Sequence, residues 1–116
     1  MCKARDARLS HYLAHLSASN DISPYTTRLA WRAWINVRAA TSPLLPVPDA
    51  CPGPDGQLLY TWDRAEHHLE LEVFPNGATE FFYRNRGSDE LWEHVGTVDG
   101  PVPESATDKL SLFIVA

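Results

Sequence analysis

The sequence predicts an α+β domain, in which two N-terminal helices pack on a four-stranded antiparallel β-meander that is followed by a short C-terminal helix or edge strand. Two patterns predict it. Apolar residues recur at helical spacing over residues 5–40, whereas they alternate with polar residues over 57–98. The 116 residues also suit one continuous core. We therefore expect a single domain over 1–116, with a proline-rich connector at 42–56 and a tail at 103–116.

The helical part predicts two helices, from about residue 5 to 18 and from Pro24 to about residue 40. In the first, leucines fall on one face of the helix. The second begins with Ser23, a favoured N-cap, followed by Pro24 at the position where a missing N–H costs nothing. Its apolar stripe consists of Leu29, Ala30, Ala33, Trp34 and Val37.

The connector contains five of the nine prolines, so we expect neither helix nor strand within it. Beyond it, alternation predicts three strands, around residues 58–62, 69–73 and 80–83, and a fourth from Leu91 to Val98. Short connections rich in turn-forming residues make these strands successive hairpins. In the tail, helical and strand spacings both fit; Ser105 or Thr107 as a cap favours the helix.

The register of the predicted sheet follows from its turns. A three-residue loop after Phe74 sets Val73 opposite Thr79, whereas a two-residue loop would set it opposite Glu80 and destroy the apolar face. In the preceding hairpin we expect Trp62 opposite His67. One face of the sheet is then apolar, and the two helices are expected to cover it.

The opposite face is predicted to be acidic with aromatic residues among the acids. Glu72 falls opposite Glu80, and like charges paired across strands cost up to about 1 kcal/mol. The central members of this face are Glu70, Glu72, Phe74, Glu80 and Phe82, and His68 and Arg84 lie towards one end. Trp92 and His94 join the same face if the fourth strand keeps the alternation.

Three interpretations of this face stay open. The connector or tail covers its aromatic residues; or the face binds another protein, as apolar surfaces rimmed by charge often do; or Glu72, Glu80 and His94 hold a metal ion. In the second interpretation, Phe74, Phe82 and Trp92 anchor the partner, and the glutamates select a basic one.

Charge is divided along the chain. Residues 1–42 carry six basic and two acidic residues, a formal charge of +4, and the rest carries four basic and thirteen acidic residues, a charge of −9. Arg28 and Arg32 lie one helical turn apart and suggest phosphate contacts as an alternative function. The total charge of −5 disfavours nucleic-acid binding.

No catalytic motif stands in the sequence. It has no nucleophile elbow, no P-loop and no dinucleotide-binding glycine pattern. His11 and His15 have the spacing of two zinc ligands, but Tyr12 replaces the glutamate of that motif. We expect no catalytic residue, metal or cofactor, and keep an enzyme using metal or paired carboxylates on the acidic face as an alternative.

The composition predicts a cytoplasmic protein. Cys2 and Cys51 have no metal or redox spacing, which favours reduced thiols. No apolar run approaches the length of about 18 residues that a membrane span requires, so no membrane partner is expected.

Residues 44–83 contain P-V-P, P-D-G-Q-L-L-Y-T-W-D, H-L-E-L-E-V, P-N-G and F-F-Y. This run resembles an uncharacterised family of small bacterial proteins with a proline-rich lead, a P-D-G turn, a strand ending in Trp and an L-E-x-E strand. Trp62, Glu70 and Glu72 match that pattern. The resemblance implies the sheet and carries no activity.

Together these patterns predict a non-enzymatic protein-binding or regulatory protein of a bacterium or phage, similar in behaviour to an antitoxin, immunity protein or inhibitor. The expected partner is another protein with a basic surface, and a homodimer is compatible with the sequence.

Overall fold

The computed structural model describes the backbone of residues 2–115 and the side chains of residues 8–115. Within this range the chain forms three helices and five strands. They are α1 (Cys2–Ala18), α2 (Pro24–Thr41), β1 (Asp49–Pro52), β2 (Leu58–Arg64), β3 (His67–Val73), β4 (Ala78–Asn85), β5 (Leu91–Thr97) and α3 (Glu104–Ser111). The predicted α+β class is confirmed, and the sheet has one strand more than predicted.

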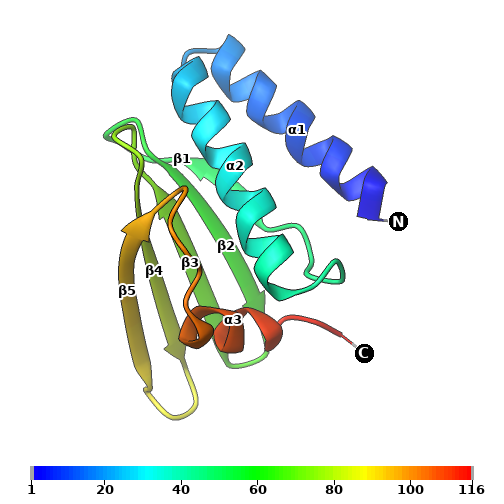
Figure 1. Ribbon diagram of the computed structural model, residues 1–116, viewed down its shortest axis with the longest axis vertical. Helices are drawn as coiled ribbons and strands as arrows, with labels where there is room; N and C mark the ends of the chain where they lie inside the picture. Colours follow the sequence, from blue (N-terminus) through cyan, green and yellow to red (C-terminus); the bar gives the residue numbers. More distant parts are fainter. Residues whose placement is uncertain (1, 116) are drawn as a thin grey trace.

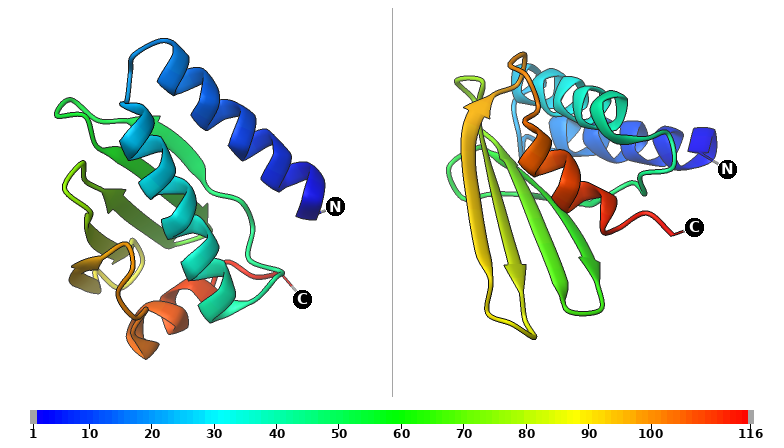
Figure 2. Two further views of the ribbon diagram at one scale, coloured as in Figure 1. Left: turned by 45° about the horizontal axis from the view of Figure 1, so that its top comes forward. Right: turned by 60° about the horizontal axis from the view of Figure 1, so that its bottom comes forward.

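The strands form one antiparallel sheet in the order β1-β2-β3-β4-β5. All three helices lie on the same side of it (Figure 1). α2 packs on β2 and β3, α1 packs against α2, and α3 packs near the C-terminal end of α2. We call the helix-covered side of the sheet the inner face and the opposite side the outer face; Figure 2 shows both from the edge.

Both predicted helices form, for the local reasons that the sequence indicated. Ser23 caps α2, since its hydroxyl accepts a hydrogen bond of 3.0 Å from the Thr26 N–H, and Pro24 occupies the first helical position. The apolar stripe of α2 is buried, and so are the leucines of α1, which are Leu9, Leu13 and Leu16.

The connector prediction was wrong at Asp49–Pro52, which forms β1 and pairs with β2. Pro48 precedes this strand and Pro52 ends it, positions at which a missing N–H leaves the ladder intact. Ala50 lies opposite Tyr60 and packs against the core. The density of prolines therefore hid a short edge strand between them.

The β3–β4 register is confirmed, with Val73 opposite Thr79. The register expected for the first hairpin was wrong by two residues, because Trp62 lies opposite Leu69. Ala65 and Glu66 alone form the loop, with Ala65 at a φ of 52°, and neither is a residue that signals such a turn. A slip of two residues keeps every side chain on its predicted face.

β5 has the opposite alternation to the one assumed. Trp92 lies opposite Tyr83 and His94 opposite Phe81, so both point to the inner face. The Trp92 ring packs 6.0 Å from that of Phe81, measured between centroids. The prediction that Trp92 and His94 belong to the acidic outer face is corrected; Leu91, Glu93 and Val95 lie there instead.

The tail is helical, as the capping argument favoured, although the cap differs. α3 begins after Pro103, which supplies no side-chain hydrogen bond, and the expected caps Ser105 and Thr107 lie inside the helix. Its apolar side chains Ala106 and Leu110 are buried, and so is Phe113 beyond its end.

The core lies between the inner face and the helices. The buried Tyr60 hydroxyl donates a hydrogen bond of 2.7 Å to the Ala30 carbonyl, which joins β2 to α2. The Trp62 indole N–H donates to the Pro46 carbonyl at 2.8 Å, which holds the connector against the sheet. These bonds satisfy the polar atoms of large aromatic residues inside an apolar core.

Candidate protein-binding face

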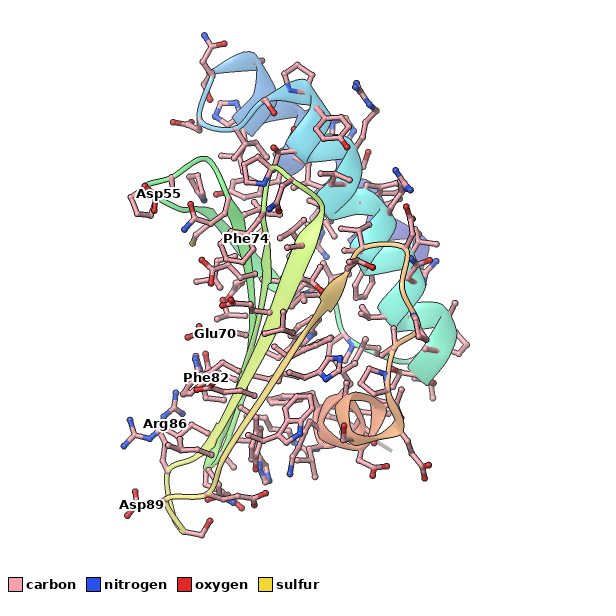
Figure 3. All side chains as sticks on the ribbon, turned by 60° about the vertical axis from the view of Figure 1, so that its left-hand side comes forward. Asp55, Glu70, Phe74, Phe82, Arg86 and Asp89 are labelled. Atoms are coloured by element: carbon pink, nitrogen blue, oxygen red, sulfur yellow. The ribbon has the colours of Figure 1, made fainter. Side chains whose placement is uncertain are left out.

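The outer face is the candidate site, because within residues 2–115 no helix packs across it (Figure 2). Glu70, Phe74 and Phe82 point away from the helices there (Figure 3). We use the name outer-face set for the following outward residues of β2 to β5 and of the turn after β3: Leu59, Thr61, His68, Glu70, Glu72, Phe74, Glu80, Phe82, Arg84, Leu91, Glu93 and Val95.

The acids of this set lie close together in the strand register. Glu72 lies opposite Glu80, as predicted. In the next outward row of the sheet, Phe82 on β4 lies between Glu70 on β3 and Glu93 on β5. Glu80 and Glu93 are exposed, whereas Glu70 and Glu72 are half-buried. An aromatic ring is therefore bordered by carboxylates on both sides.

Gln57, which the sequence did not single out, holds one of these carboxylates in place. Its side-chain amide donates a hydrogen bond of 3.0 Å to Glu72 Oε2, and its carbonyl oxygen accepts one of 2.8 Å from the Asp55 N–H. Gln57 is itself only 7% exposed. Its polar atoms are thus paired, and the Glu72 carboxylate has a fixed partner. No motif marks a buried glutamine of this kind.

The apolar members give the outer face its contact area. Phe74 and Phe82 are half-buried at the surface. Leu91 and Val95 are 61% and 68% exposed, respectively. A shallow depression of about 170 Å³ lies among the acids and Phe82, and Val95 contributes to its lining. Trp92, predicted as a third anchor, packs on the inner face instead.

An ionic row closes one end of the outer face. His68 Nδ1 lies 2.8 Å from Asp63 Oδ1, and His68 Nε2 lies 2.7 Å from Glu70 Oε2. Arg86 Nη2 donates to the same Asp63 oxygen at 2.7 Å. Both ring nitrogens of His68 face carboxylates, an arrangement that suits the protonated imidazole, which donates from both.

This row shifts the pKa of two of its members. Burial lowers the pKa of His68, but the hydrogen bonds to Glu70 and Asp63 outweigh burial, and the net pKa is raised above its usual value. Burial raises the pKa of Asp63, but hydrogen bonds from His68 and Arg86 outweigh it, and the net pKa is lowered. The row therefore favours the charged forms of both groups.

The arginines of the nucleic-acid hypothesis lie on the opposite side of the molecule, on α2. Arg32 forms an ion pair with Asp99. The Arg28 guanidinium lies 5.9 Å from the centre of the Tyr25 ring. Arg28 and Arg32 both border a mainly apolar groove of about 420 Å³ between α1 and α2. Of these two arginines, Arg32 therefore already has an acidic partner within the protein.

The metal hypothesis does not gain geometric support. The alternation places His94 on the face opposite Glu72 and Glu80. In the part of the chain that the structure describes, no group of three or more His, Cys, Asp or Glu side chains is arranged to hold a metal ion.

A third hollow lies beside the end of β2 that does not pair with β1. It has a volume of about 570 Å³ and is lined by connector residues, by the end of β2 and by Phe113 and Val115 of the tail. Arg64 closes one side, since its guanidinium donates to the Leu112 carbonyl at 3.1 Å. The sequence did not indicate this hollow, because its walls come from three distant segments.

Comparisons with protein-family models, curated proteins and solved structures find no match to this chain. The family resemblance of residues 44–83 therefore stays a prediction. None of the helices described is long and apolar enough to cross a membrane.

Proposed function

We propose that this protein is a non-enzymatic binding or regulatory protein whose outer sheet face docks another protein with a basic surface. One observation carries the proposal: the outer-face set combines aromatic and aliphatic side chains with a concentration of glutamates, and no described helix covers it. Apolar surfaces bordered by charge are typical of protein contacts.

The charges of the face define the partner. Glu70, Glu72, Glu80 and Glu93 border Phe82 and Val95, so a partner that presents lysine or arginine around an apolar group matches both features. Complementary charge accelerates encounter and rejects acidic surfaces. Burial of the apolar side chains then supplies the favourable free energy of binding.

The pairing of Glu72 with Glu80 supports a binding role. Like charges directly opposite each other on neighbouring strands destabilise a sheet by up to about 1 kcal/mol. A cationic group of the partner placed between the two carboxylates would remove this repulsion on binding. The pair is thus unfavourable in the free protein and favourable in the complex.

A protein with these properties would act as an antitoxin-like, immunity-like or inhibitor-like accessory of a bacterial or phage system. A cytoplasmic location fits the exposed free thiol of Cys51, which is stable in a reducing compartment. This assignment rests on surface chemistry.

The test compares two charge-reversal variants as immobilised baits in a lysate of the source organism. Glu80→Lys changes the outer face, and Asp108→Lys makes the same charge change on the exposed side of α3. Glu80→Lys replaces a like-charge pair by an opposite-charge pair, so its free energy of unfolding should not fall. Loss of a bound protein is then not explained by unfolding.

Basic proteins that the wild type enriches should lose at least about tenfold of their signal on Glu80→Lys, equivalent to about 1.4 kcal/mol. Asp108→Lys should retain them. Equal recovery of every enriched protein on both variants would overturn the assignment of this face.

A further inference from the structure

The two edges of the sheet differ in how they are protected against pairing with another strand. β1 has only four residues and lies between Pro48 and Pro52. β5 has seven residues, pairs with β4 in unbroken register and contains no proline, lysine or arginine. Prolines, lysines, bulges and short length are among the devices that protect natural sheet edges. β5 has none of these four; its one acidic or basic side chain apart from His94 is that of Glu93. Figure 1 shows no element beyond its free side.

The hydrogen-bond pattern shows which backbone groups of β5 are free. The Asn85 N–H donates to the Glu90 carbonyl at 2.9 Å, and the Val98 N–H donates to the Gly77 carbonyl at 2.9 Å. Because bonded and non-bonded pairs alternate in antiparallel strands, even-numbered residues of β5 bond to β4. The outward N–H and C=O groups belong to Leu91, Glu93, Val95 and Thr97.

Within residues 2–115, one of these outward groups already has a partner. The Thr97 carbonyl accepts a hydrogen bond of 3.1 Å from the Gly100 N–H, and this leaves its second lone pair available. The free edge is therefore able to accept a whole strand.

We propose that this strand is β5 of a second copy, paired antiparallel about a two-fold axis at His94, so that one continuous sheet crosses both protomers. In this register Glu93 faces Val95 of the second copy, and Leu91 faces its Thr97. All four outward residues of each copy then form bonded pairs. The two-fold axis makes each of these pairs occur twice, and His94 lies opposite its own counterpart on the axis.

The side chains fit this register. On the inner face, Trp92 lies opposite Gly96 of the second copy, a position that adds no side chain of its own beside the neighbouring His94 ring. On the outer face, Glu93 lies opposite Val95 and not opposite Glu93 of the second copy, which avoids a like-charge pair. Leu91 and Val95, which are 61% and 68% exposed, gain cross-strand neighbours. These matches favour a second copy over a strand of another protein.

The first experiment measures the mass of the purified protein in solution by light scattering after size exclusion, at protomer concentrations on the order of 100 μM. The wild type should have twice the protomer mass of 13.0 kDa. Val95→Pro removes an outward N–H and leaves the bonds to β4 intact, so it should be monomeric with an unchanged circular dichroism spectrum. Val95→Thr keeps the N–H and should stay dimeric.

A monomeric wild type, or a dimeric Val95→Pro, would overturn the proposal. Glu80→Lys, which alters the outer face and not the edge, should leave the mass unchanged. Failure of this dimer is therefore distinguishable from failure of the proposed function.

A second experiment tests the register in a background with Cys2→Ser and Cys51→Ser. His94→Cys places the two thiols directly opposite each other at a non-bonded pair, where the separation of the Cβ atoms is close to what a disulfide spans. Oxidation should link most of the protein into covalent dimers. Glu93→Cys places its thiols diagonally, at about 7–8 Å, and should link poorly. The reverse result would overturn this register.

Discussion

His68 shows how one residue connects local charge to stability. Its imidazole lies between Asp63 and Glu70, and its ring nitrogens are 2.8 Å and 2.7 Å from the two carboxylates. Because its pKa is raised in the folded protein, folding favours its protonated form. That contribution is fully present below the ordinary histidine pKa of about 6.5 and is lost as pH rises through the raised value.

His68→Gln should therefore cost more stability at low pH than at high pH. We expect the difference in free energy of unfolding between wild type and variant to be larger at about pH 6 than at about pH 9. Urea unfolding at both pH values measures it. A difference that is the same at both, or larger at the higher pH, would contradict the role assigned to His68.

Sequence patterns located most of the outer-face residues but not the contacts that order them. Strand alternation identified Glu72 and Phe82, because side-chain direction follows directly from the period of two. Gln57 was missed, since its importance comes from burial beneath the Glu72 carboxylate, and burial depends on how distant segments pack.

At the level of elements, a buried hydrogen bond within the apolar core joins α2 to the sheet. The Tyr60 hydroxyl, on β2, donates to the Ala30 carbonyl of α2 at 2.7 Å. Tyr60→Phe removes the donor and keeps the ring, so it should lower the free energy of unfolding by about 0.5–1.5 kcal/mol. Chemical denaturation at constant pH measures the change.

Tyr25→Phe provides the matched control, because the Tyr25 side chain is exposed on the same helix. Its free energy of unfolding should change by less than about 0.5 kcal/mol. Equal effects of the two substitutions would show that the buried hydroxyl does not stabilise the contact between α2 and β2.

The edge strand β5 shows why sequence-based prediction chose the wrong face for Trp92 and His94. In β3 and β4 apolar residues occupy one set of alternate positions, so their faces followed from the sequence. In β5 both sets contain large apolar residues, Leu91 and Val95 in one and Trp92 in the other, and alternation alone does not choose between them. The choice comes from the loop after Asn85, which sets Leu91 opposite Arg84.

In the whole molecule, the uneven charge of the sequence becomes a separation of faces. Arginines lie on α2, which covers the inner face, and four glutamates lie together on the outer face. The Arg32–Asp99 ion pair links the helical layer to the segment after β5. The four glutamates around Phe82 make the central part of the outer face negative, which favours association with a basic surface.

The central claim is that the outer face, and not the helical side, contacts the partner. The most direct measurement is carboxyl labelling read by mass spectrometry. It compares the free protein with its complex with the captured partner. Glu70, Glu72, Glu80 and Glu93 should lose labelling in the complex, whereas Glu104 and Asp108 on α3 should label equally in both. Protection of the α3 acids with unchanged labelling of the four outer-face glutamates would contradict the account.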